Sequence, residues 1–123
     1  MKATTTSDPR AMIRPRLYLA GPITIGPGKI DILRKVDETR SISAAARALG
    51  MTYKHAWLLI DSLNEGFGRP VVETATGGRG GGGTVLTELG RQLVERYVAL
   101  EARLNSSAKA ELDALVQLTR PVT

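Results

Sequence analysis

The sequence contains no cysteine and only one histidine, His55, in 123 residues. Disulfides and thiolate metal sites are therefore excluded. A single imidazole also cannot supply the ligand sets of most transition-metal sites, and no sequence feature provides it with a buried partner acid for Ser-His-Asp chemistry. We therefore expect no metal, no cofactor and no enzymatic activity.

Aromatic residues and long apolar runs are also scarce. Only 4% of the residues are aromatic against 42% hydrophobic overall, so aliphatic and alanine side chains must build the core. No apolar run approaches the roughly 20 residues that span a bilayer, and the first ten residues, MKATTTSDPR, lack the apolar segment of a signal peptide. We expect a cytoplasmic protein that does not associate with membranes.

The net charge of +5 is unevenly distributed along the chain. Residues 1–20 carry four basic and one acidic side chain, and residues 21–83 carry eight and six. Residues 84–123 carry five of each and are neutral overall. The positive excess is therefore +3 in residues 1–20 and +2 in residues 21–83. A positive excess favours a polyanionic partner.

Residues 41–64, SISAAARALGMTYKHAWLLIDSLN, predict two short helices joined by a tight turn. The first helix spans residues 43–49, and Gly50 takes the left-handed conformation that ends it. Thr52 then caps the second helix with its hydroxyl. The buried stripe of that helix comprises Ala56, Ile60 and Leu63. This pattern is typical of a helix-turn-helix, whose second helix reads DNA.

A glycine-rich stretch follows at residues 76–83, TGGRGGGG, between two strand-prone runs at 71–75 and 84–86. A hairpin with glycines and Arg79 at its tip is typical of the wing of a winged helix-turn-helix. Arg79 can reach a phosphate or the minor groove.

The same glycines also satisfy the G-x-G-x-x-G pattern of dinucleotide-binding folds at Gly78, Gly80 and Gly83. That pattern requires alternating strands and helices around it, which the chain does not show. The G-K-[ST] of a P-loop is absent too, so the wing is the better interpretation of the glycines.

The flanking segments complete a predicted fold that is mainly α with a small β wing. Residues 1–15 predict a flexible arm, and residues 16–86 the DNA-binding domain. This domain begins with one strand or a small hairpin at 16–25 and a helix at 28–38, with Pro27 in its first turn. Residues 87–123 predict a C-terminal helical dimerisation region, which begins with a cap at Thr87 and is interrupted at 105–107. Its long helix carries an apolar stripe for a partner, comprising Leu89, Leu93, Tyr97, Leu100 and Leu104. Residues 108–120 either pair with a second copy or fold back on their own subunit.

Residues 27–104 resemble the N-terminal DNA-binding domain of the molybdate-responsive ModE regulators, which is related to the winged helix-turn-helix of LysR-type regulators. Three motifs carry the resemblance: SISAAARALG, the Y-K-x-A-W of residues 53–57, and VETATGG-R-GGGG-x-x-LT. The resemblance implies a dimer whose recognition helix enters the major groove of double-stranded DNA. ModE regulators continue into C-terminal domains that bind the oxyanion, and this sequence ends at Thr123, so we do not expect it to bind molybdate.

The resemblance also implies a DNA-facing surface made of Ser43, Thr52, Tyr53, Lys54, His55, Trp57 and Arg79. Lys54 donates either to guanine or to a phosphate. Trp57 either packs inside the protein or faces sugars and thymine methyl groups. Ser43 is expected to cap the first helix of the pair and also to contact a phosphate. The predicted function is a sequence-specific transcriptional regulator that binds a two-fold symmetric operator. The alternative is a winged-helix protein-interaction module without DNA binding.

Overall fold

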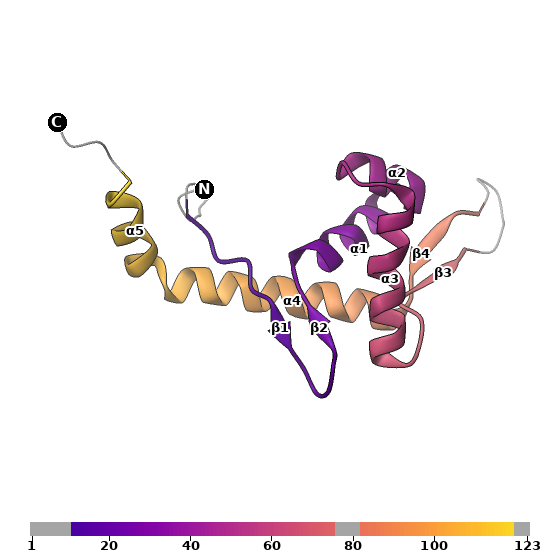
Figure 1. Cartoon of the computed structure of the whole chain (residues 1–123), viewed down its shortest axis with the longest axis horizontal. Coiled ribbons are helices and arrows are strands. Elements are labelled where there is room, and N and C mark those ends of the chain that lie inside the picture. Colours follow the sequence, from indigo (N-terminus) through magenta and orange to yellow (C-terminus); the bar gives the residue numbers. More distant parts are fainter. Residues whose placement is uncertain (1–10, 76–81, 120–123) are drawn as a thin grey trace.

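The computed structural model describes residues 11–75 and 82–119. The helices of residues 27–67 lie beside the first half of one long helix, and the last helix lies at its other end (Figure 1). The elements are, in order, β1 (Leu17–Tyr18), β2 (Thr24–Ile25), α1 (Pro27–Thr39), α2 (Ile42–Ala48), α3 (Tyr53–Phe67), β3 (Val72–Thr74), β4 (Thr84–Leu86), α4 (Glu88–Ser107) and α5 (Lys109–Gln117). The predicted class, mainly α with a small β wing, is confirmed.

Helix α1 is the centre of the domain because it contacts α2, α3, α4 and β4. Pro27 occupies its first turn, as the sequence predicts, where a missing N–H costs nothing. Its buried side chains are Ile30, Ile32, Leu33 and Val36. With these residues at most 1% exposed, α1 is covered on more than one side. The rest of the core is aliphatic, as the scarcity of aromatic residues predicts.

Helices α2 and α3 form the predicted pair, with one correction at the first N-terminus. Ser41, not Ser43, is the N-cap of α2, and its hydroxyl accepts from the Ala44 N–H at 2.9 Å. Ser41 has the extended backbone that a cap requires. Arg40 before it ends α1 in the left-handed conformation, with φ +59°. The predicted turn is confirmed, since Gly50 has φ +70° and the Thr52 hydroxyl accepts from the His55 N–H at 3.0 Å.

Two small antiparallel hairpins flank the helices. Strands β1 and β2 pair in a hairpin that leads into α1, so of the two predicted alternatives, one strand or a small hairpin, the structure has the hairpin. Strands β3 and β4 pair Val72 with Leu86 and form the base of the wing. Residues 76–81, with Arg79, lie outside the described residues.

The base of the wing is attached to the turn between α1 and α2. The Thr84 N–H donates to the Arg40 carbonyl oxygen at 3.0 Å. Gly83 beside it has φ +109°, and a Cβ at this position would lie 2.7 Å from the same oxygen. Only glycine fits this position without strain. The wing is therefore fixed relative to the helix pair at its base.

Helix α4 begins at the predicted cap and ends later than predicted. The Thr87 hydroxyl accepts from the Gly90 N–H at 3.1 Å. The interruption expected at residues 105–107 is wrong, because the helix continues to Ser107 and α5 begins at Lys109. Asn105 lies inside the helix, and its side chain binds the backbone of Ile13 and the Glu101 carbonyl oxygen.

Candidate nucleic-acid interface

The first turn of α3 presents its side chains to solvent. Tyr53, Lys54 and His55 are all exposed, Tyr53 by 55%. Lys54 lies opposite the buried stripe of Ala56, Ile60 and Leu63, which packs on the core. Tyr53 lies on the side of this stripe and is exposed because it begins the helix. The cap by Thr52 and the burial of this stripe thus place the predicted reading residues together in one exposed turn.

Trp57 is held partly inside the domain. It is half-buried against the core, and its ring meets the Tyr53 ring edge-on at a centroid distance of 6.4 Å and an angle of 79°. This edge-on arrangement is a favourable aromatic geometry. Of the two roles left open by the sequence, the structure supports packing, with Trp57 supporting the exposed Tyr53.

Helix α2 adds two exposed side chains at i and i+4, Ser43 and Arg47. Sequence reasoning selected Ser43 but missed Arg47. The spacing of four residues, which puts both on one side of the helix, is the signal that could have found it. Within the described residues, neither Arg47 nor Lys54 takes part in an ion pair. Both cations are therefore available to an anionic partner.

Leu58 is a second residue that sequence reasoning missed. It follows Lys54 by one helical turn and is 57% exposed, opposite the buried stripe of α3. The predicted buried stripe of α3 includes Leu63 but gives Leu58 no role, and the structure places Leu58 on the outer face. An exposed leucine there offers a surface for an apolar group of a ligand.

The helix pair and the wing share one end of the domain, away from α5 (Figure 1). Strands β3 and β4 project beside α2 and the start of α3, and α4 runs along the other side. The arrangement allows the start of α3 and the wing to meet the same extended ligand.

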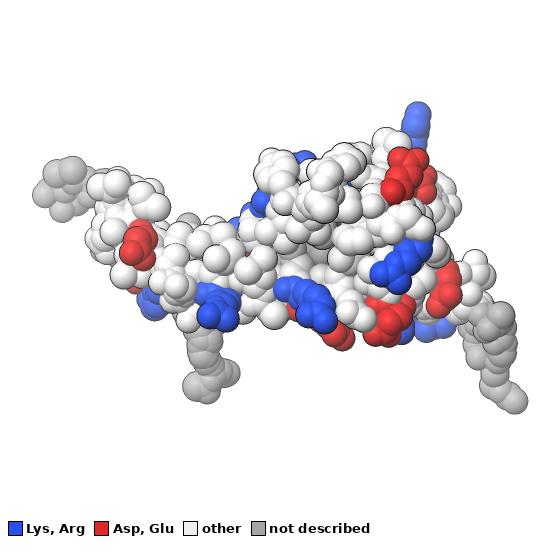
Figure 2. Space-filling model, turned by 90° about the horizontal axis from the view of Figure 1, so that it is seen from below, with Lys and Arg blue, Asp and Glu red and all other residues white. Residues whose placement is uncertain are grey.

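The face of the molecule drawn in Figure 2, which is seen from below relative to Figure 1, carries charges of both signs. Figure 2 shows Lys and Arg interleaved with Asp and Glu on this face, with no large field of one sign. Two of the ion pairs on the C-terminal helices are Arg91 with Glu88 at 2.7 Å and Lys109 with Asp113 at 2.8 Å. Such a face suits water or a protein better than a polyanion.

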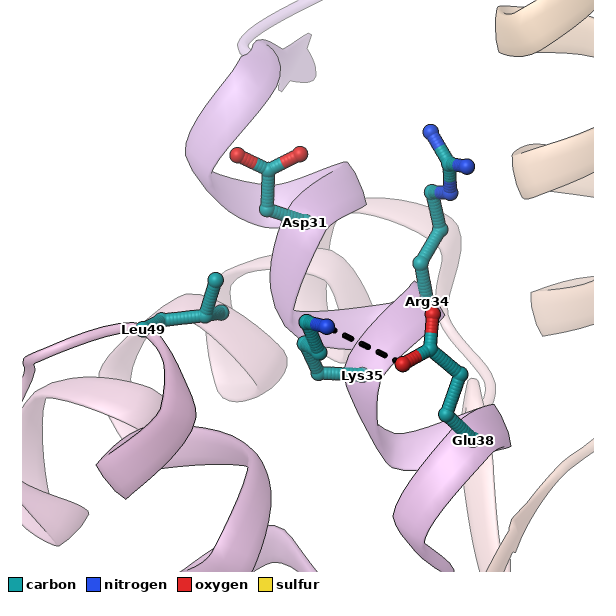
Figure 3. A pocket seen from close by; sticks show the side chains of 5 residues that line it. All are labelled: Asp31, Arg34, Lys35, Glu38 and Leu49. Carbon is teal, nitrogen blue, oxygen red and sulfur yellow. Dashed lines mark hydrogen bonds and ion pairs between the residues drawn. The ribbon is translucent and has the colours of Figure 1, made fainter.

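A shallow hollow of about 260 Å³ lies beside α1, lined by Asp31, Arg34, Lys35, Glu38 and Leu49 (Figure 3). Its charges are largely matched inside the protein. Lys35 Nζ lies 3.0 Å from Glu38 Oε1, and the Asp31 carboxylate accepts two hydrogen bonds from Arg14. The hollow therefore has no strong preference for an anion or a cation. In residues 11–75 and 82–119, no group of three or more His, Cys, Asp or Glu side chains is placed to hold a metal ion.

The residues predicted to dimerise divide into two groups. Leu89, Leu93 and Tyr97 pack within their own subunit, and Tyr97 is only 4% exposed. Leu100 and Leu104 are half-buried and lie beyond the main core cluster. On α5, Leu115 is exposed and Val116 is buried, and Leu118, which follows the helix as its C-cap, is exposed. None of the helices in the described residues is long and apolar enough to cross a membrane.

Comparison with known proteins agrees with this geometry. Residues 28–96 match the family described as bacterial regulatory helix-turn-helix protein, lysR family. The chain is 44% identical over 78 residues to the molybdenum-pterin-binding protein MopB of Rhodobacter capsulatus, covering 63% of this chain and 29% of that protein. It is 39% identical over 95 residues to the molybdenum transport protein ModE of Azotobacter vinelandii, covering 77% and 34%.

A third relative is the DNA-binding transcriptional dual regulator ModE of Escherichia coli, 40% identical over 81 residues, or 66% of this chain and 31% of that protein. The matched region thus spans about a third of the length of these relatives. The match includes α1, the helix pair, the wing and the first half of α4. The chain therefore belongs to the LysR-type bacterial regulatory helix-turn-helix family and carries a ModE-like DNA-binding domain.

Proposed function

We propose that this chain is a cytoplasmic transcriptional regulator that binds double-stranded DNA sequence-specifically, as a dimer on a two-fold symmetric operator. The observation that carries the proposal is the exposed first turn of α3, where Lys54 stands at the same end of the domain as Arg47 and the wing. A major groove admits an α-helix, and side chains from the first turn of such a helix reach base edges.

In this mechanism the polar residues divide into two roles. Lys54, Tyr53 and His55 read bases from the start of α3, while Ser43, Thr52 and Arg47 contact phosphates from the turn and from α2. Arg79 of the wing contacts the backbone or the minor groove. Phosphate contacts fix the register of the protein on the duplex, and base contacts supply the specificity.

Selection of bound fragments from genomic DNA tests the proposal. We expect one enriched, two-fold symmetric sequence. The absence of any enriched sequence would contradict the proposal and favour the interaction module instead.

The substitution Lys54→Ala tests the role of the recognition helix. It removes a donor to guanine, for which a good contact is worth about 1–3 kcal/mol of discrimination. We expect specific affinity to fall by about tenfold or more, with a much smaller loss on random DNA, in fluorescence anisotropy titrations.

Lys109→Ala is the matched control for Lys54→Ala. Lys109 is a lysine of α5 that is ion-paired with Asp113, remote from α3. The substitution Lys109→Ala is expected to leave the affinities for specific and for random DNA unchanged. If Lys54→Ala lowers the affinity for the specific sequence and for random DNA equally, Lys54 contacts only a phosphate.

A further inference from the structure

Residues 13–15, which we call the brace, are bonded to the second half of α4. The Ile13 N–H donates to Asn105 Oδ1 at 2.7 Å, and Asn105 Nδ2 donates back to the Ile13 carbonyl oxygen at 3.0 Å. The Tyr97 hydroxyl donates to the Pro15 carbonyl oxygen at 2.7 Å. These bonds join residues 92 and 82 positions apart in the sequence. The segment is thus held at two points of α4, Tyr97 and Asn105, that lie about two turns apart.

The middle residue of the brace connects it to α1. Arg14 donates to both carboxylate oxygens of Asp31, at 2.9 and 2.7 Å, and its Nε lies 4.0 Å from Glu101 of α4. Both hydrogen bonds to Asp31 come from one nitrogen, Arg14 Nη2, and each is a charge-assisted bond. The brace therefore joins the central helix of the DNA-binding domain to the far part of α4, and Figure 1 shows it running beside α4 before entering β1.

The other support of α4 lies near its start. There Gly90 packs so closely on the Val71 carbonyl that a side chain would overlap it. Gly90 and Asn105 are 15 residues apart, about 22 Å along a helix. Leu93 and Tyr97 also pack on the core, so the domain itself holds the first half of α4. The brace extends the held length to Asn105 in the second half. A longer held length leaves α4 a narrower range of directions relative to the domain.

We propose that the brace sets the spacing between the two half-sites that a dimer of this chain recognises. Asn105, Tyr97 and Arg14 are the positioning residues. The inference rests on the proposed function, in which two subunits pair through α4. The direction of α4 in each subunit then determines the distance between the two recognition helices. A tilt of about 10° acting over about 20 Å moves a recognition helix by about 3.5 Å, close to the 3.4 Å rise of one base pair.

The first experiment measures the direction of α4 without DNA. The chain has no cysteine, so Ser62→Cys on α3 and Ala102→Cys on α4, both exposed positions, take one spin label each. Labelled protein is diluted with unlabelled protein, so that the distance measured lies within one chain. We expect a narrow distance distribution in the parent protein and a clearly broader one when Tyr97→Phe and Asn105→Ala are combined.

These two substitutions remove the hydrogen bonds of Tyr97 and Asn105 to the brace and leave Arg14 with its partners Asp31 and Glu101. Asn105→Ala also removes the hydrogen bond from Asn105 Nδ2 to the Glu101 carbonyl oxygen within α4. Phenylalanine keeps the ring in the core, and alanine is a better helix former than asparagine. Gln92→Ala, an exposed position of α4 remote from the brace, is the control. If the double variant does not fold, Asn105→Ala alone is measured. An unchanged distribution in a folded variant overturns the inference.

The second experiment measures half-site spacing. Affinity is determined for duplexes that carry the selected operator with zero, one or two base pairs inserted at its centre. We expect the parent protein and Gln92→Ala to favour one spacing, and the double variant to lose about tenfold of that preference while binding random DNA as before. A preference retained in the double variant overturns the inference. Absence of any specific binding by the parent protein would instead contradict the proposed function and leave the spin-label distances to decide whether the brace fixes α4.

Discussion

At the residue scale, Leu58 provides a sharp test of how α3 contacts DNA. Its exposed side chain lies one turn beyond Lys54 on the outer face of the helix. The 5-methyl group of thymine is the apolar feature of the major groove. We therefore expect deoxyuridine in place of one operator thymine to weaken binding about fourfold, since burial of one methyl-sized group contributes about 0.8 kcal/mol.

The measurement is a double substitution cycle in protein and DNA. Leu58→Ala should bind thymine and uracil operators equally, because the contact that distinguishes them is gone. Leu115→Ala changes an equally exposed leucine of α5 and should retain the fourfold difference. If replacement of every operator thymine in turn by uracil changes the affinity of the parent protein and of Leu58→Ala equally, Leu58 does not contact a thymine methyl group.

The environment of Tyr97 predicts how the stability of the protein depends on pH. Burial of its hydroxyl, together with Glu101 nearby, raises the pKa of Tyr97 above the ordinary value of 10.0. The unfolded chain therefore loses this proton first, and the free energy of unfolding falls as the pH rises above 10. Urea unfolding between pH 7 and 11 should show a shallower alkaline loss in Tyr97→Phe than in the parent. Tyr53→Phe, at an exposed ring, should retain the parental slope.

At the scale of elements, the contact of α4 with the base of the wing depends on Gly90. In an ordinary helix position, alanine in place of glycine stabilises by up to about 1 kcal/mol. Here the new methyl group would overlap the Val71 carbonyl, which is backbone and cannot rotate away. We expect Gly90→Ala to lower the free energy of unfolding by about 1–3 kcal/mol in urea titrations.

Gly28→Ala is the matched control for this prediction. It lies in the first turn of α1, where a Cβ would meet only Leu59 Cδ1 at 4.0 Å. We expect it to be neutral or slightly stabilising. Equal effects of the two substitutions would show that helix propensity, and not the contact with Val71, sets the cost at position 90.

At the scale of the whole molecule, the proposed dimer depends on the part of α4 that the domain leaves uncovered. Leu100 and Leu104 are half-buried, lie one turn apart and do not belong to the main core cluster. Glutamate at both positions would place two charges in a paired interface, which is costly without partners. We expect Leu100→Glu with Leu104→Glu to sediment as a monomer at micromolar concentration, while the parent protein sediments as a dimer.

A thermal melt of the same variant, followed by circular dichroism, separates a loss of assembly from a loss of folding. Because neither leucine belongs to the core cluster, far-ultraviolet circular dichroism should show a folded variant. Ala102→Glu adds a charge on the exposed side of α4 and should remain dimeric. A parent protein that is itself monomeric would contradict pairing through α4.

Much of the fold could be predicted because its signals are local. Pro27, Gly50, Thr52 and Thr87 act through the conformation or hydrogen bonds of their own turns, and each lies where the sequence predicts. The buried stripe of α3 follows from helical periodicity alone. Ser41 is the exception, because the sequence predicts Ser43 as the cap, and no propensity indicates the left-handed Arg40 that ends α1 directly before Ser41.

The candidate site also contains some residues that the sequence predicts and others that only the structure reveals. The exposed turn with Tyr53, Lys54 and His55 follows from the cap and the stripe, which are both in the sequence. The packing of Trp57 and the exposure of Leu58 and Arg47 depend on which neighbours cover each side, and these come from other elements. Arg79 lies outside the described residues, so its contact with DNA stays a prediction.

The sequence by itself determined the helix pair, the wing strands and the uneven charge, because turns, caps and periodicity act over a few residues. Only the tertiary structure decided that Asn105 binds Ile13, that Tyr97 belongs to its own subunit and that Gly90 must have no side chain. Each of these depends on groups between 19 and 92 positions apart, which chain folding alone brings into contact.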